Sequence, residues 1–129
     1  MQDKTNCLAV VSYINPFPDI QAIPIKRDFL SLQQQYSTCQ RCPALCTSRT
    51  KVVFGSGNPH SEIIFIGEAP GAEEDSQGIP FCGASGKVLQ ELLASINLTR
   101  DDVFITNTIL CRPENNRNPA KEEVENCRE

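Results

Sequence analysis

The chain has 129 residues, of which 40% are hydrophobic, and this is enough for one α/β domain. Its net charge of −4 gives no global sign of a nucleic-acid-binding protein, so any contact with DNA must be local. Residues 1–20 lack a basic start and hold only a short apolar stretch, so we expect neither a secretory signal nor a membrane span. Seven cysteines, an odd number, argue against a closed disulfide framework and favour a reducing, cytoplasmic compartment.

Prolines interrupt the start of the chain, so we expect residues 1–25 to form an irregular arm and residues 26–129 to form the domain. Residues 26–38 predict a short helix that leads to the first cysteine pair. Residues 52–54 predict a brief strand. Residues 62–66 are almost continuously apolar, which is typical of a strand covered on both faces in a parallel sheet.

The second half alternates helix and strand. Residues 86–97 predict an amphipathic helix, because five apolar side chains share one face, and residues 103–106 predict a second buried strand. Asn118 and Pro119 predict the start of a last helix. This order predicts a parallel sheet with its ligand beyond the carboxyl ends of the strands, where the loop at residues 67–71 and Asn107 both lie.

The cysteines carry the sharpest chemical pattern. Two residues separate Cys39 from Cys42, and fifteen separate Cys111 from Cys127. Four thiolates suit either zinc or a 4Fe-4S cluster, and the spacing does not separate the two. The competing interpretation is that the second pair are buried small hydrophobic residues. We expect no ligand role for the remaining three cysteines, Cys7, Cys46 and Cys82.

Two loops add a second pattern. The acidic loop at residues 67–75 follows a predicted strand, and its glycines let backbone amides approach a ligand closely. It lacks the G-x-G-x-x-G spacing of a dinucleotide site. Phe81 lies on a glycine- and proline-bounded loop and Asn107 at a strand end. Either could be an ordinary core or turn residue, but an aromatic face and an amide together suit a nucleobase pocket.

Five segments, in this order along the chain, strongly resemble the iron–sulfur uracil-DNA glycosylases of family 4. They are Cys39-Gln-Arg-Cys42, Arg49-Thr-Lys-Val-Val-Phe-Gly55, Gly67-Glu-Ala-Pro-Gly-Ala-Glu-Glu-Asp75, Gly78-Ile-Pro-Phe81, and Thr106-Asn-Thr-Ile-Leu-Cys-Arg-Pro113 continuing through Asn116-Arg-Asn-Pro119 to Cys127. The resemblance covers residues 26–129 and is far more specific than any single motif.

The resemblance implies a three-layer α/β fold with a central parallel sheet. It implies a monomeric DNA repair enzyme that hydrolyses the N-glycosidic bond of uracil in DNA and leaves an abasic site. It also favours a 4Fe-4S cluster over zinc. The implied cluster ligands are Cys39, Cys42, Cys111 and Cys127.

The same resemblance implies residue roles. Phe81 would stack on a flipped uracil and Asn107 would bind its polar edge, while the backbone of Glu68, Ala69 and Pro70 would line the pocket and hold uracil O2. Ala69 stands where the best-known uracil glycosylases have a water-positioning Asp, which leaves Glu68 and Glu74 as candidates for that role. DNA contacts would come from two arginines, Arg112 and Arg117, with Arg49 and Lys51 as further candidates.

One departure stands out. The family carries a later His-Pro-Ser segment, and this chain has only His60, which we expect in a surface turn. We therefore expect a C-terminally truncated member with an incomplete sheet and weak or no activity. Two alternatives stay open: a four-cysteine zinc-binding structural module, and a non-catalytic metal- or cluster-binding domain that binds nucleic acid.

Overall fold

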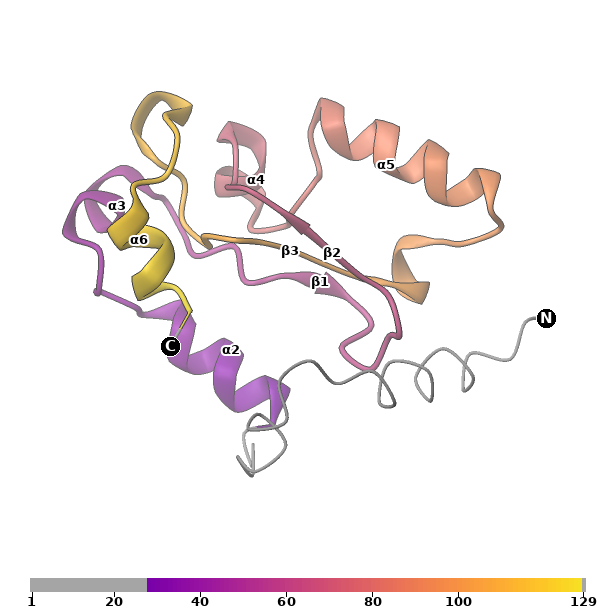
Figure 1. Ribbon diagram of the computed structural model, residues 1–129, viewed down its shortest axis with the longest axis horizontal. Coiled ribbons are helices and arrows are strands. Elements are labelled where there is room, and N and C mark those ends of the chain that lie inside the picture. Colours follow the sequence, from indigo (N-terminus) through magenta and orange to yellow (C-terminus); the bar gives the residue numbers. More distant parts are fainter. Residues whose placement is uncertain (1–27, 129) are drawn as a thin grey trace.

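The computed structural model describes residues 28–128, so the arm predicted for residues 1–25 and Cys7 lie outside the described part. The elements follow one another as α2 (Phe29–Ser37), α3 (Pro43–Ser48), β1 (Ser56–Gly57), β2 (Ile64–Gly67), α4 (Ala72–Gln77), α5 (Ala84–Ser95), η2 (Arg100–Asp102), β3 (Phe104–Asn107), η3 (Glu114–Asn116) and α6 (Lys121–Asn126) (Figure 1). Within the described residues no helix is long and apolar enough to cross a membrane.

The three strands form one sheet in the order β1-β3-β2. β2 and β3 pair in parallel, as predicted, with Ile64 opposite Phe104 and Gly67 opposite Asn107. The short β1 pairs antiparallel with β3, so the described sheet is mixed. The parallel register brings the carboxyl ends of β2 and β3 side by side, and the predicted ligand-binding edge of the sheet therefore exists.

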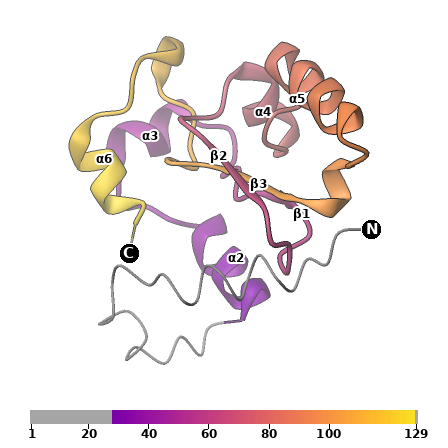
Figure 2. The same cartoon turned by 45° about the vertical axis from the view of Figure 1, so that its right-hand side comes forward.

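Helices lie on both sides of this sheet, with α5 on one side and α2 on the other (Figures 1 and 2). Successive strand residues point to opposite faces, which explains the arrangement. Ile105 packs with Leu89 and Leu93 of α5 in one buried cluster. Its neighbour Phe104 meets the ring of Phe29 of α2 edge-on, with ring centroids 5.4 Å apart.

The prediction that the strand at residues 62–66 is covered on both faces is wrong. Ile64 and Ile66 are 58% and 67% exposed, because β2 is an edge strand of the described sheet, and α2 on this face packs over Phe104 of β3 and leaves the edge uncovered. The apolar face of α5 is likewise only half buried. It packs Leu89 and Leu93 inward, and leaves Val88 and Leu92 exposed.

The predicted strand at residues 52–54 is also wrong, since the ladder begins only at Ser56. The backbone N–H of Val53 instead donates to the Leu110 carbonyl, 2.7 Å away, beyond the end of β3. Val53 is fully buried there. The segment is extended and lies against the loop after β3 instead of against β3. Its apolar residues therefore have the sequence pattern of a strand although they belong to no sheet of the described structure.

The last helix begins two residues later than predicted, with Ala120 rather than Asn118 as its N-cap. The Glu123 carboxylate accepts the Ala120 N–H at 2.9 Å and pairs with the Arg117 guanidinium at 2.6 Å. This ion pair fixes where α6 starts, and Pro119 lies before the helix.

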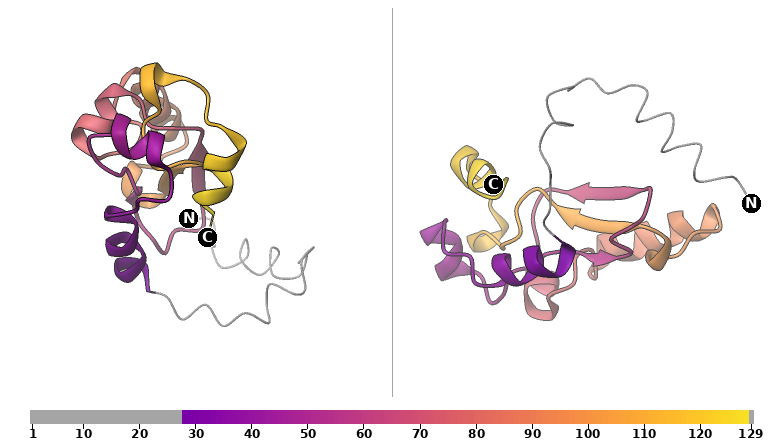
Figure 3. Two further views of the ribbon diagram at one scale, coloured as in Figure 1. Left: turned by 90° about the vertical axis from the view of Figure 1, so that its left-hand side faces the viewer. Right: turned by 90° about the horizontal axis from the view of Figure 1, so that it is seen from below.

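α2, α3 and α6 gather on one side of the molecule, seen from two directions in Figure 3. The Tyr36 hydroxyl donates to the Cys127 carbonyl at 3.4 Å, and the Asn126 side chain donates to the Arg41 carbonyl at 3.3 Å. A second core lies here around two fully buried side chains, Leu45 and Ile109. The protein therefore has one core on the sheet and another among the cysteine-bearing segments.

Asp75 joins these two regions. Its side chain lies on α4, the residue is 4% exposed, and one carboxylate oxygen accepts the backbone N–H groups of Thr50 at 2.7 Å and Lys51 at 3.4 Å. Sequence reasoning treated it only as part of an acidic loop. A buried carboxylate that accepts two backbone donors is a structural residue.

We predict that Asp75→Ala lowers the free energy of unfolding by about 1–3 kcal/mol, because it removes a buried carboxylate that accepts two backbone hydrogen bonds. The measurement is urea denaturation under anaerobic conditions. Asp101→Ala removes an exposed carboxylate and is the control. Equal midpoints for the two variants would contradict the structural role of Asp75.

Candidate functional site

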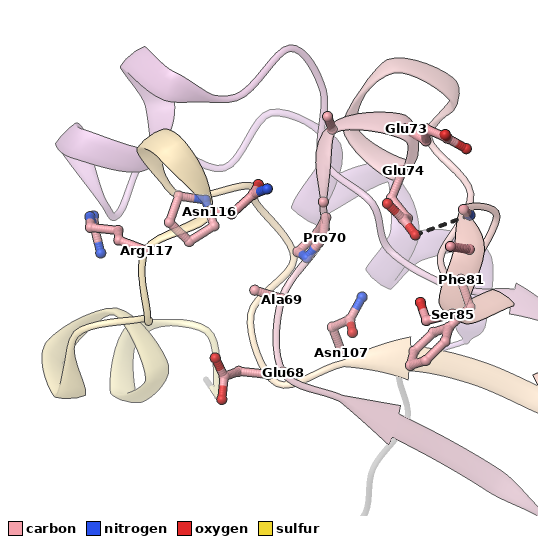
Figure 4. Close-up of a pocket in the computed structure, with 15 residues that line it drawn as sticks. Glu68, Ala69, Pro70, Glu73, Glu74, Phe81, Ser85, Asn107, Asn116 and Arg117 are labelled. Carbon is pink, nitrogen blue, oxygen red and sulfur yellow. Dashed lines mark hydrogen bonds between the residues drawn. The ribbon is translucent and has the colours of Figure 1, made fainter. Parts of the chain in front are cut away.

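A cavity of about 510 Å³ lies at the carboxyl ends of β2 and β3 (Figure 4). Its wall combines the loop after β2, the first turns of α4 and α5, the Phe81 loop, Asn107 and the loop after β3. The lining residues include Glu68, Ala69, Pro70, Glu74, Phe81, Asn107 and Arg117. The structure therefore brings the predicted base-binding residues to one cavity, at the edge of the sheet where parallel strands bind ligands.

Gly67 determines how this cavity is built. A Cβ at this position would lie 2.4 Å from Asn107 Oδ1 and 2.6 Å from Cζ of the Phe81 ring, so no larger residue fits without moving both. The amide and the ring thus approach each other across a glycine at the end of β2. The sequence placed Gly67 after a predicted strand, in a loop whose glycines let the backbone approach a ligand, but it did not show that the absent Cβ makes room for Phe81 and Asn107.

Asn107 presents to the cavity a side-chain amide that has no hydrogen-bond partner among the described residues. The residue is only 7% exposed, yet its side chain makes no hydrogen bond to any group in the described residues. Buried amides are normally hydrogen-bonded, and one that faces a cavity instead retains both a donor and an acceptor for a ligand.

The two acids proposed for catalysis differ in placement. Glu74, on α4, is half-buried and accepts the Gly83 N–H at 3.3 Å, which ties α4 to the Phe81 loop. Glu68 is exposed and in Figure 4 extends away from Phe81. It also borders a second hollow beside Pro119. Only Glu74 is held in place by a described hydrogen bond.

The loop after β2 is fixed by backbone hydrogen bonds. The Thr108 N–H donates to the Gly67 carbonyl at 2.8 Å and the Ile109 N–H donates to the Glu68 carbonyl at 3.1 Å. Pro70 is fully buried, and a proline has no N–H. Any backbone donor of the Glu68 to Pro70 segment must therefore come from Glu68 or Ala69.

The candidate DNA-binding cations are arranged differently from one another. Arg112 donates through Nε to the Asn116 side chain at 2.9 Å and meets no acid in the described structure. Arg117 lines the cavity, but its guanidinium forms two bonds to Glu123, at 3.0 and 2.6 Å. The hydrogen bond between the two side chains lowers the pKa of Glu123 and raises the pKa of Arg117.

Arg49, expected as a further DNA contact, turns inward instead. Its guanidinium donates to Cys111 Sγ at 3.1 Å and to the Cys39 carbonyl at 2.5 Å. The arginine therefore belongs to the cysteine region, and its role there was not visible from the sequence because its partners are 10 and 62 residues away.

The four paired cysteines come together in the second core. Cys42 and Cys111 are buried in one cluster, against which Cys127 packs. Cys39 is close enough for its charge to influence the pKa of all three others. Among the described residues, however, no three His, Cys, Asp or Glu side chains converge closely enough to hold a single metal ion.

The thiols differ in acidity. Burial raises the pKa of Cys42, Cys111 and Cys127, and at Cys111 the Arg49 guanidinium opposes this. Burial also acts to raise the pKa of Cys39, but hydrogen bonds from Arg41 and the charge of Arg49 outweigh it, so the Cys39 pKa is lowered. Positive charge is thus already placed where thiolates would need it.

Comparisons with known proteins place this sequence in a family. Residues 54–129 match the family model of the uracil DNA glycosylase superfamily. A type-4 uracil-DNA glycosylase of Archaeoglobus fulgidus is 53% identical over 94 residues, which cover 73% of this chain and 47% of the relative. The corresponding proteins of Sulfurisphaera tokodaii and Thermotoga maritima are each 46% identical, over 74% of this chain and 44% and 50% of their own lengths.

The chain thus spans about half the length of the curated relatives it matches. The matched residues include β2, the Phe81 loop and β3, which contribute to the cavity. They also include Cys111 and Cys127, two of the four paired cysteines. On this evidence the chain belongs to the uracil DNA glycosylase superfamily.

Proposed function

We propose that this protein hydrolyses the N-glycosidic bond of uracil in DNA and leaves an abasic site. The observation that carries the proposal is the meeting of the Phe81 ring and the unbonded Asn107 amide across Gly67, inside a cavity. The type-4 uracil-DNA glycosylases to which the chain is similar support the same activity.

Recognition would follow from the two side chains. A uracil extruded from the DNA stack would lie against the Phe81 ring, with its polar edge on the Asn107 amide. The amide can donate to uracil O4 and accept from N3–H, whereas cytosine presents the opposite pattern. A site built to hydrogen-bond one base rejects another because its buried polar groups are then left unpaired.

Bond cleavage would depend on charge. As the glycosidic bond breaks, uracil O2 gains negative charge and the sugar becomes cation-like, and backbone donors of Glu68 or Ala69 would stabilise the oxygen. A water then attacks C1′ of the sugar. We assign the positioning of that water to Glu74 or Glu68, with Glu74 favoured because its hydrogen bond to Gly83 fixes it at the wall.

We predict that Asn107→Ala lowers uracil release from a single-uracil oligonucleotide by at least about 100-fold, because it removes the hydrogen bonds that select and hold the base. The measurement is strand cleavage at the abasic site after treatment with alkali. Gln90→Ala, which removes an exposed amide on α5, is the matched control. DNA binding without uracil release by the unsubstituted chain would favour a non-catalytic nucleic-acid-binding domain instead.

A 4Fe-4S cluster fits the thiol set better than zinc. The thiols are close enough to influence the pKa of their neighbours in the set Cys39, Cys42, Cys111 and Cys127. No three of them approach closely enough to hold one ion, and a cluster is larger than an ion. Such a cluster, held by four thiolates, would link segments that are far apart in sequence and stabilise the fold.

We predict that Cys111→Ser and Cys127→Ser lose iron and acid-labile sulfide, whereas Cys46→Ser retains both. The Cys46 thiol is directed at the Cys39 carbonyl, 3.6 Å away, and is the matched control for a nearby cysteine. Elemental analysis and visible absorbance of anaerobically purified protein provide the measurement. Stoichiometric zinc without sulfide would contradict the cluster.

Phosphate contacts would come first from Arg112, whose terminal guanidinium nitrogens have no described partner. Arg117 is already paired with Glu123, so we propose that it holds α6 against the cavity as well as facing DNA.

We predict that Arg112→Gln weakens binding to DNA similarly for all sequences and reduces the slope of log affinity against log salt by about 1, since one phosphate contact releases about one counterion. Fluorescence anisotropy over a salt series measures this. Lys121→Gln, which removes an exposed cation from α6, is the control. An unchanged salt slope would remove Arg112 from the DNA contacts.

A further inference from the structure

The backbone of Phe81 is in an uncommon conformation. Its φ of 52° lies in the left-handed region, which bulky side chains rarely adopt. Such a conformation persists only when surrounding groups hold it, and it is found preferentially at functional sites. The groups that hold it therefore control where the ring lies.

Arg100 is the first of these groups. Its guanidinium donates to the Phe81 carbonyl at 2.7 Å and to the Pro80 carbonyl at 2.6 Å, with a further bond to the Ser56 hydroxyl at 3.3 Å. One side chain thus binds two consecutive carbonyls of the strained loop. A planar guanidinium can do this because its donors form a rigid fork, which an ammonium lacks.

Gly86 confines the same carbonyl from another direction. It lies in the first turn of α5, and a Cβ at this position would be 1.8 Å from the Phe81 oxygen. The oxygen is therefore enclosed between the helix backbone and the guanidinium. Arg100 and Gly86 are not among the residues that line the cavity, so both hold the Phe81 loop from outside it.

Arg100 also connects the loop to Asn107. It begins η2, which is closed by a hydrogen bond from the Thr99 N–H to the Asp102 carboxylate at 2.8 Å and runs directly into β3. Asn107 is the last residue of β3. The ring and the amide are therefore fixed by the same stretch of chain.

We propose that Arg100 is the positioning residue that sets the Phe81 ring against Gly67 and Asn107, and so determines the geometry of base stacking. The proposal rests on the proposed function, in which Phe81 stacks on uracil. Arg100 acts through the loop and does not touch the base.

The first test compares uracil release by Arg100→Gln, Arg100→Lys and the unsubstituted chain. Arg100→Gln should lower kcat/KM by about 10- to 100-fold, because a small displacement of a positioned group is enough for such a loss. Arg100→Lys keeps the charge but can bind only one carbonyl well, and should be intermediate. Lys87→Gln removes an exposed cation from α5 and should leave the rate unchanged.

The second test does not depend on activity. The chain holds six phenylalanines, so 4-fluorophenylalanine labelling gives few fluorine NMR signals, and Phe81→Leu identifies the signal of Phe81. Arg100→Gln should shift or broaden this signal. The signal of Phe29, whose ring packs on the opposite face of the sheet, should stay unchanged and report an intact fold.

The outcomes separate the two proposals. A perturbed Phe81 signal in a chain that releases no uracil would support the positioning role and defeat the proposed function. An unperturbed Phe81 signal with full activity in both variants would overturn the positioning role. If Arg100→Gln alters the Phe29 signal as well, Arg100→Lys decides, and a wild-type Phe81 signal in that variant overturns the proposal.

Discussion

The parallel register of β2 with β3 is the constraint on which the rest of the structure depends. It places Gly67 opposite Asn107 at the carboxyl edge of the sheet, and the missing Cβ of Gly67 leaves space for the Phe81 ring and the Asn107 amide. A shift by one residue would turn Asn107 to the other face and close this space with a side chain. Strand pairing thus places Asn107 in the cavity, and the surrounding loops and the first turns of α4 and α5 supply the rest of its wall.

Arginines that bond within the protein provide the second organising feature. Arg49 binds a thiol and a carbonyl in the cysteine region, Arg100 binds the carbonyls of the Phe81 loop, and Arg117 binds the carboxylate that starts α6. Each uses a planar guanidinium, whose fixed donors can bind more than one acceptor at once. In an acidic chain, these arginines act chiefly on the protein itself, which explains why counting cations in the sequence overstates the number available to DNA.

Patterns in the sequence predicted most elements but not which of their faces are covered. The helix at residues 86–97 and the strand at residues 103–106 are confirmed as α5 and β3. Hydrophobicity alone does not predict that Ile64 and Ile66 are exposed, because an apolar strand has the same sequence pattern at the edge and in the middle of a sheet. The start of α6 was misplaced for a related reason, since the Arg117–Glu123 pair, and not the local Asn-Pro sequence, sets it.

The sequence by itself determined the superfamily, the paired cysteines, and Phe81 and Asn107 as the candidate base-binding residues, because these depend on residue type and order. The tertiary structure decided the rest: that Gly67 joins ring and amide, that Asp75 is structural, that Arg49 serves the thiols and that Arg100 holds the Phe81 loop. These contacts join residues that are 10 to 62 positions apart in the chain. Such contacts leave no local pattern, because their energetics depend on burial and on hydrogen-bond geometry that only the folded backbone defines.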